Sequence, residues 1–244
     1  RTVQITNKSQ IDQWVEDYGE DSDFVKVRVR GVFPSSSSTQ LIGTDVANAA
    51  RNREAHSQVF DPLILGVDVA RFGDDQSVLA LRRGRDAESY PWRKYRGLDS
   101  IQLGNMVMEV MREQRQMGDP VDAVFIDGGG VGAGVIDYLR SLGHDVHEVN
   151  FGGKPRTTRF KNKRAEMWVL MKEWLKERGA VPDDDELYYD LIAPEYAYTA
   201  DNKIVLESKD DMKRRGIQSP DCADALALTF AQDVAQREQW PGKP

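Results

Sequence analysis

The sequence has very few of the residues that support sulfur or zinc chemistry: a single cysteine, Cys222, and three histidines among 244 residues. One cysteine cannot form an internal disulfide or a cysteine metal site, and the histidines show no ligand spacing. Long apolar runs are also missing, since none approaches the roughly 18 residues that a membrane-spanning helix needs. These absences exclude a disulfide-stapled domain and predict a protein with no membrane span. Cys222 is expected to be a small buried helix residue.

An excess of positive charge is missing as well. The chain has 33 Lys and Arg against 40 Asp and Glu, which gives a net charge of -7. Domains that bind nucleic acids tightly usually present a net positive field, so strong unaided DNA binding is not expected. Basic residues are nevertheless concentrated at 154–164 and 213–215. Such segments can hold a nucleic-acid backbone locally, although a solvated surface explains them equally well.

The sequence does contain a regular succession of short strands and helices after its first sixty residues. Strand-like segments at 63–70, 77–83 and 89–97 are joined by short turns, which favours antiparallel pairing. A helix, a strand at 121–128, a second helix and a strand at 144–151 follow, and strands separated by helices pair in parallel. We therefore predict an α/β fold with a ribonuclease H-like mixed sheet: three antiparallel strands, then parallel strands, flanked by helices on both faces.

Four aspartates stand where this topology brings carboxylates together. Asp68 lies near the end of the first of these strands and Asp127 near the end of the fourth, while Asp221 and Asp224 are three apart and share one face of the last helix. An unpaired carboxylate in an apolar setting costs several kcal/mol, so it is normally paired or bound to a metal. Asp221 also has a simpler explanation as a first-turn acid favoured by the helix dipole. That explanation does not extend to Asp224, deeper in the helix.

The chemistry of such a cluster can be stated from the residue types. Parallel pairing of the strands that carry Asp68 and Asp127 places two like charges side by side, and a divalent cation removes this repulsion. Hard carboxylate oxygens with few histidines nearby select magnesium or manganese over zinc. A third carboxylate from the last helix completes a site for two metals roughly 4 Å apart, the arrangement that hydrolyses phosphodiesters by in-line attack of water.

A glycine-rich segment, 127–134, supports a competing interpretation. Gly128, Gly130 and Ala133 fit a relaxed dinucleotide-binding fingerprint, and Glu148 stands about 20 residues further on, as a ribose-binding acid would. Against this, Asp127 directly precedes the first glycine, where its charge would face a pyrophosphate. The three preceding strands also do not suit that fold. We therefore interpret the glycines as a tight turn beside a metal site.

Five motifs in order, GVDVARFGDDQS, FIDGGGVGAGVIDYL, NKRAEMW, KDDMKRRG and SPDCADALALTF, resemble the C-terminal nuclease domain of the large terminase subunit of tailed bacteriophages. The resemblance implies a ribonuclease H-like fold and a metal-dependent endonuclease using two Mg²⁺ or Mn²⁺ ions. Such an enzyme cleaves concatemeric double-stranded viral DNA during genome packaging. The portal protein and the small terminase subunit are the implied partners, and the implied location is the cytoplasm of the infected bacterial host, at the procapsid portal.

The resemblance also implies site residues and boundaries. Asp68, Asp127 and an aspartate of SPDCADAL would be the catalytic metal ligands; we prefer Asp224, with Asp221 as an accessory ligand. The candidate DNA-binding residues come from the two basic segments: Arg156, Arg159, Lys161, Lys163, Arg214 and Arg215. Residues 61–236 would form the nuclease domain and 237–244 a tail. Residues 1–60, with an expected helix at 9–19, a strand at 24–33 and a helix capped by Thr44, would join it to an ATPase motor.

Two other functions are compatible with parts of this pattern. One is a non-catalytic docking module of the packaging motor. The sequence has no G-x-x-x-x-G-K-[ST] loop, so no ATPase motif is present. Retention of the aspartates at the strand ends argues against a docking module. The other is an actin-like or sugar-kinase-like nucleotide-binding domain, which shares the strand order but normally needs two copies to close on ATP.

Overall fold

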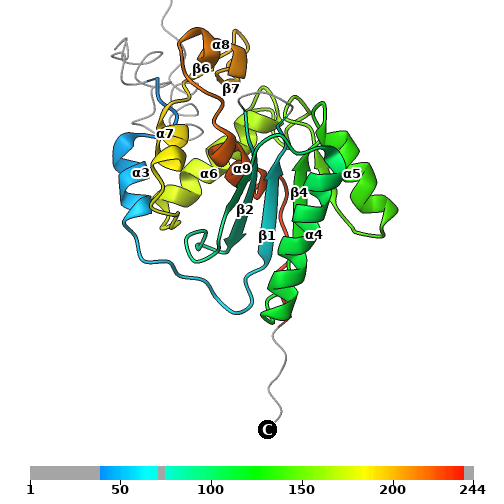
Figure 1. The fold of residues 1–244 in the computed structure, drawn as a ribbon. Helices are drawn as coiled ribbons and strands as arrows, with labels where there is room; N and C mark the ends of the chain where they lie inside the picture. Colours follow the sequence, from blue (N-terminus) through cyan, green and yellow to red (C-terminus); the bar gives the residue numbers. More distant parts are fainter. Residues whose placement is uncertain (1–38, 71–74, 239–244) are drawn as a thin grey trace, which may run out of the picture.

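The computed structural model describes residues 39–70 and 75–238, and Figure 1 shows the arrangement of their helices and strands. The helix expected at 9–19 and the strand expected at 24–33 lie outside the described residues. Within the described ranges, no helix combines the length and the apolar character that crossing a membrane would need.

A five-stranded mixed sheet forms the centre of the molecule, with the strand order β3-β2-β1-β4-β5. β1 pairs antiparallel with β2 and β2 antiparallel with β3, whereas β4 runs parallel to both β1 and β5. This confirms the predicted sheet and its place in the ribonuclease H-like class. The strands are β1 (Leu63–Asp68), β2 (Ser77–Arg83), β3 (Arg93–Tyr95), β4 (Ala123–Asp127) and β5 (His147–Val149).

The register of the central strands positions the first two aspartates. Val67 of β1 pairs with Ile126 of β4, so the next residues, Asp68 and Asp127, end adjacent parallel strands at the same edge of the sheet. Both strands are buried along almost their whole length, as expected for strands covered on two faces. The sheet therefore delivers two carboxylates to one edge.

Helices cover both faces of the sheet (Figure 1). On one face α4 and α5 pack against aliphatic side chains such as Leu65 and Ile126; on the other, α6 and α9 pack against Ile64 and Phe125, with α3 and α7 beside them. The helices are α3 (Thr44–Arg51), α4 (Ser100–Gln116), α5 (Gly132–Ser141), α6 (Lys163–Lys176), α7 (Asp185–Ile192), α8 (Lys209–Arg214) and α9 (Asp221–Leu228). A hairpin of β6 (Tyr196–Tyr198) and β7 (Ile204–Leu206) precedes α8.

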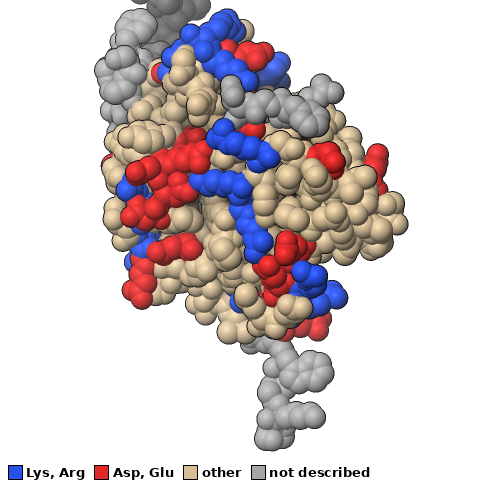
Figure 2. Space-filling view, viewed as in Figure 1, with Lys and Arg blue, Asp and Glu red and all other residues tan. Residues whose placement is uncertain are grey.

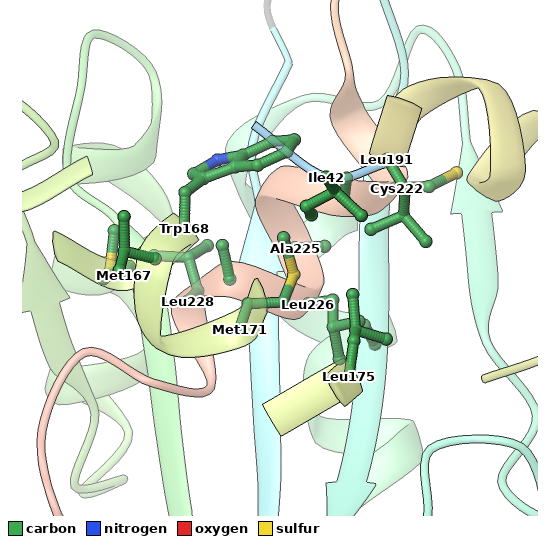
Figure 3. Close-up of a cluster of buried hydrophobic side chains, with 14 of the residues drawn as sticks. Ile42, Met167, Trp168, Met171, Leu175, Leu191, Cys222, Ala225, Leu226 and Leu228 are labelled. Atoms are coloured by element: carbon green, nitrogen blue, oxygen red, sulfur yellow. The ribbon is translucent and has the colours of Figure 1, made fainter. Parts of the chain in front are cut away.

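The core on the α6 and α9 face is shown in Figure 3, where Trp168 and Met171 of α6 lie beside Leu226 and Leu228 of α9. These side chains have exposed fractions of 0%. Cys222 is also fully buried, which confirms the expectation of a small buried helix residue. Met167, Trp168 and Met171 of α6 thus stabilise the fold by packing.

Gly66 allows α9 to approach the sheet closely. A Cβ atom at this position would lie 2.0 Å from the main-chain oxygen of Ala225, a distance that no side chain can occupy. The missing side chain therefore brings the backbone of α9 onto β1, two residues before Asp68. This contact places the acids of α9 beside the ends of β1 and β4.

Two helix starts differ from the sequence expectation. Thr44 was expected to cap its helix, but Gly43 is the N-cap and Thr44 is the first helical residue. The last helix begins at Asp221 after Pro220, two residues later than its expected start at Ser219. Proline fits the entry to a helix because its missing N–H has no partner there in any case.

Candidate metal centre

The four aspartates singled out in the sequence come together in the structure, and we call Asp68, Asp127, Asp221 and Asp224 the acid cluster. The exposed fractions are 2% for Asp68, 5% for Asp221 and 0% for Asp224, while Asp127 is partly exposed. Repulsion is strongest at Asp68: after burial, the largest effect, Asp224, Asp221 and Asp127 all raise the pKa of Asp68. Such a group of buried carboxylates needs cations.

Lys209, the first residue of α8, supplies one cation. Its Nζ lies 3.7 Å from Asp68 Oδ2, 3.7 Å from Asp221 Oδ1 and 3.0 Å from Asp224 Oδ2. Burial alone would lower the pKa of Lys209, but the surrounding carboxylates outweigh it and raise the pKa. The ammonium group is therefore charged and lies between three members of the acid cluster.

Asp224 is held by partners on both of its oxygens. Arg164 donates from Nε to Oδ1 at 3.0 Å and from Nη2 to Oδ2 at 3.3 Å, and Trp168 Nε1 donates to Oδ1 at 2.7 Å. Burial acts to raise the pKa of Asp224, but Arg164 and Lys209 outweigh it and the pKa is lowered. Asp224 is thus an ionised carboxylate whose hydrogen-bonding capacity is largely used within the protein.

Asp68 and Asp221 are less completely paired. Asp68 Oδ1 is buried and has no hydrogen-bond partner, and burial, the largest effect, raises the pKa of Asp68 despite Lys209. Asp221 Oδ2 accepts a hydrogen bond from the main-chain N–H of Gln76 at 3.1 Å, while Oδ1 faces Lys209. Burial also raises the pKa values of Asp127 and Asp221. Asp68, Asp127 and Asp221 are therefore the acids whose negative charge is least compensated by the protein.

This donor set fits a hard divalent ion. Within residues 39–70 and 75–238, no three His, Cys, Asp or Glu side chains already surround one point as metal ligands would, and Lys209 lies between the carboxylates instead. The donors are nevertheless all carboxylate oxygens, one of them buried without a partner, and oxygen ligands are those that magnesium and manganese prefer. Rearrangement of Lys209 would free the space between the acids.

α7 forms a second layer behind α9. Asp190 Oδ2 accepts a hydrogen bond from the main-chain N–H of Cys222 at 2.9 Å, so an acid of α7 caps α9, whose own N-cap, Pro220, provides no side-chain bond. Gln76, which holds Asp221, also donates from Nε2 to Glu186 Oε1 at 2.5 Å. Burial raises the pKa of Asp190 to about 8. These contacts fix the N-terminal turn of α9, which carries Asp221.

The glycine-rich segment turns tightly beside the acid cluster. Gly130 has φ +56°, in the region that favours glycine, and a Cβ atom at Gly132 would lie 1.7 Å from the main-chain oxygen of Asp127. Glu148 lies against Gly128 instead of standing free. Because β1 to β3 are antiparallel, the sheet does not have the doubly wound parallel order of dinucleotide-binding domains.

The candidate DNA-binding residues lie in separate places, and several have acidic partners. Figure 2 shows Lys and Arg gathered at the top of the molecule, where α8 lies in Figure 1. There Arg214 pairs with Asp211, and Arg215 pairs with Glu195 and Glu207. Near the start of α6, Lys163 and Arg156 both pair with Glu166. Arg159 and Lys161 are exposed.

Sequence analysis missed Lys209, Arg164 and Asp190. Lys209 and Arg164 stood in segments already noted, KDDMKRRG and NKRAEMW, but only as part of a resemblance. Arg164 is 60 residues away in sequence from its partner Asp224, and Asp190 is 32 residues away from its partner Cys222. Sequence spacing does not report contacts of this kind. The one available signal was the presence of a basic residue within each motif.

Comparison with known proteins gives a structural match. Neither the protein-family models nor the curated proteins match this sequence. The nuclease domain of the large terminase subunit gp2 of bacterial virus Sf6 superposes with a TM-score of 0.64 at 18% identity, covering 80% of this chain and 99% of that one. A mutant of that domain with manganese and beta-thujaplicinol has a TM-score of 0.62 at 17% identity, covering 80% and 99%.

The large terminase nuclease from thermophilic phage G20c with bound magnesium superposes with a TM-score of 0.56 at 17% identity, covering 82% of this chain and 99% of that one. Each of these solved domains is therefore matched over nearly its whole length. At such low identity the likeness establishes the fold, and it agrees with the fold predicted from the strand order. The described chain has the ribonuclease H-like fold of the nuclease domains of phage large terminase subunits.

Proposed function

We propose that this chain is a metal-dependent endonuclease domain that cleaves double-stranded viral DNA during genome packaging. The observation that carries the proposal is Asp68: a buried carboxylate with an unpartnered oxygen, at the end of a central strand, facing three further carboxylates. A structural acid would have its oxygens satisfied. The proposal is supported by the presence of manganese or magnesium in nuclease domains of the same fold.

In this proposal Asp68, Asp127 and Asp221 would hold two Mg²⁺ or Mn²⁺ ions. The sequence favoured Asp224 as the third ligand, but its contacts favour Asp221, because Arg164 and Trp168 already occupy the oxygens of Asp224. Asp224 would instead anchor Arg164 and Lys209 in the cluster. It remains close enough to act as an accessory ligand if Lys209 moves.

The metal ions would supply an activated water and charge stabilisation at the phosphate. The protein's contribution is positioning. Gly66 and Asp190 fix α9, and the register of β1 and β4 fixes Asp68 against Asp127. Asp127 is the most exposed of the four acids and lies beside the turn at Gly128 and Gly129, so the phosphate approaches from this side. Asp68, Asp221 and Asp224 are buried.

The wider setting is also a proposal. We propose residues 61–236 as the nuclease domain and 1–60 as a segment that joins it to an ATPase motor, with 237–244 as a tail. The portal protein and the small terminase subunit would be partners in the cytoplasm of the infected bacterial host, at the procapsid portal. A non-catalytic docking module is the alternative, and it predicts no cleavage.

The test compares three asparagine variants in a plasmid-cleavage assay and in melting curves with and without manganese. Asp68→Asn removes a repelled charge, so its metal-free melting temperature is expected to equal or exceed that of the unmodified chain. It should lose cleavage and most of the manganese-induced rise in melting temperature. Asp221→Asn should lose the same two properties. Asp224→Asn should lower the metal-free melting temperature, because Arg164 loses its buried partner.

The outcomes separate the alternatives. Intact supercoiled plasmid with the unmodified chain, manganese and high protein concentration would eliminate the nuclease in favour of the docking module. A normal manganese shift in Asp221→Asn together with its loss in Asp224→Asn would restore Asp224 as the third ligand. Chelator must abolish cleavage in every active sample.

A further inference from the structure

A pocket of about 520 Å³ lies along the edge strand β5 and differs in charge from other pockets of the described surface. Its lining contains four basic residues and one acid, Glu148; we call it the basic pocket, and its basic residues are Arg140, Lys154, Arg156 and Lys163. By contrast, carboxylates outnumber basic residues two to one in the pockets beside Trp174 and beside Asp221. On a chain with a net charge of -7, the basic pocket is a local exception.

Two of these cations have no acidic partner among the described residues. Arg156 and Lys163 share the buried carboxylate of Glu166, with a Lys163 Nζ to Oε2 distance of 2.7 Å. Within the part of the chain that the structure describes, Arg140 and Lys154 form no ion pair; Arg140 only donates from Nη2 to the main-chain oxygen of Val146 at 3.1 Å. Both side chains are exposed. The pocket thus presents cations able to bind an anion.

The wall of the basic pocket is continuous with the acid cluster. Val149, which lines the pocket, accepts a hydrogen bond through its main-chain oxygen from Gly128 N at 2.9 Å, and Gly128 directly follows Asp127. Glu148, the single acid of the pocket, lies against Gly128 and so toward the cluster. A strand of nucleic acid whose phosphate reaches Asp127 would therefore also be near the wall of the basic pocket.

The same scaffold holds both sites. The main-chain N–H of Lys163 donates to Gly153 O at 2.9 Å, which ties the loop after β5 to the start of α6. The main-chain N–H of Arg164 donates to Phe151 O, also at 2.9 Å, while its guanidinium group holds Asp224. The basic pocket and the acid cluster consequently keep a fixed spacing, as a subsite and a reaction centre must.

We propose that the basic pocket binds a backbone phosphate of the DNA strand next to the position of cleavage, with Arg140 and Lys154 supplying the charge. This inference rests on the proposed nuclease function for its choice of ligand. Lys and Arg contacts to phosphate give affinity and register without reading sequence. Such a contact supplies the attraction that the net charge of the chain lacks, and it adds a measurable salt dependence to binding.

The experiment measures binding of a fluorescent 30-base-pair duplex in chelator, where cleavage cannot occur, over a series of salt concentrations. The double variant Arg140→Ala with Lys154→Ala is expected to weaken binding and to reduce the slope of log K against log salt by about 1, since the one phosphate contact that it removes contributes about 0.9. The control is Arg85→Ala with Arg112→Ala, which removes the same charge. Arg85 follows β2 at the end of the sheet opposite Asp68, and Arg112 is an exposed residue of α4.

Three readouts decide the result. A slope and affinity equal to those of the control variant would overturn the inference. So would a loss of thermal stabilisation by inorganic phosphate with unchanged DNA binding, because the pocket would then serve a small anion. An unchanged manganese shift in melting temperature shows that the acid cluster is intact, and Lys154→Ala alone replaces the double variant if the latter melts early.

The two proposals fail separately. If the unmodified chain leaves plasmid intact with manganese but the double variant still loses the salt slope, the nuclease function falls and the phosphate site stands. If the unmodified chain cuts and the double variant binds and cuts normally, the nuclease stands and the phosphate site falls.

Discussion

The two faces of the central sheet are built differently. α4 and α5 cover one face and bury no charged side chain, whereas α6 and α9 on the other face bury Arg164, Glu166, Asp221 and Asp224. The first face gains stability from apolar area, a non-directional effect that tolerates changes of shape. The second depends on paired charges and on one close backbone contact. Specific chemistry is concentrated where the fold is most sensitive to substitution.

Among substitutions that test this difference between the two faces, Arg164→Met is expected to cause the largest loss of stability. The substitution leaves Asp224 buried without its guanidinium partner, and breaking such a pair typically costs about 3–5 kcal/mol. Urea denaturation of the metal-free protein measures the loss. The matched change on the other face, Arg115→Met at an exposed position of α4, should cost less than about 0.5 kcal/mol.

Adding Asp224→Leu to Arg164→Met sharpens this test. If the cost arises from an unpaired charge, the double variant should recover part of the lost stability. A double variant less stable than Arg164→Met would mean that packing around Trp168, and not charge, dominates this face.

Gly66→Ala should have the next largest effect. The new methyl group would meet the main-chain oxygen of Ala225, which cannot move without shifting α9, so a loss of about 2–3 kcal/mol and a weaker manganese shift are expected. The control on the other face is Gly104→Ala in α4, where the nearest atom belongs to the Tyr138 side chain. That ring can swing, and alanine favours the helix by up to about 1 kcal/mol. Equal losses in both variants, measured by thermal melting, would contradict the contrast.

The smallest predicted effect concerns pH. Burial raises the pKa of Asp190 to about 8, well above its unfolded value, so the folded state binds a proton that the unfolded state releases. This contribution to stability is complete below about pH 4 and is lost as the pH rises toward 8. Between pH 7 and 9 the loss should be on the order of 1–2 kcal/mol.

Asp190→Asn should remove this slope while keeping an acceptor for the N–H of Cys222. Denaturation at pH 7 and pH 9 provides the comparison. Asp137→Asn, at an exposed position of α5, is the control and should leave the pH dependence unchanged. A slope that persists in Asp190→Asn assigns the effect to another group.

The sequence was sufficient for those parts of the fold that depend on local pattern. Strand alternation, short turns and helical periodicity predicted the mixed sheet, and the strand order then predicted that Asp68 and Asp127 would meet at one edge. The partners of Asp224 were not predictable, because Arg164 and Lys209 reach it through tertiary contacts that no sequence period reports. The cap of α9 by Asp190 is a similar case, since capping residues are normally sought next to the helix they cap.

The net charge of the acid cluster and its two basic partners limits how many metal ions the site can bind. With Asp68, Asp127, Asp221 and Asp224 ionised, Arg164 and Lys209 neutralise only half of the negative charge. The deficit equals the charge of a single divalent ion, so one ion makes the site electrically neutral. A second ion makes it positive by two, or by one if Lys209 leaves the space between the acids, and either charge is unfavourable in a buried setting unless an anion enters with it. In the proposed nuclease, electroneutrality would therefore couple binding of a second ion to the arrival of phosphate.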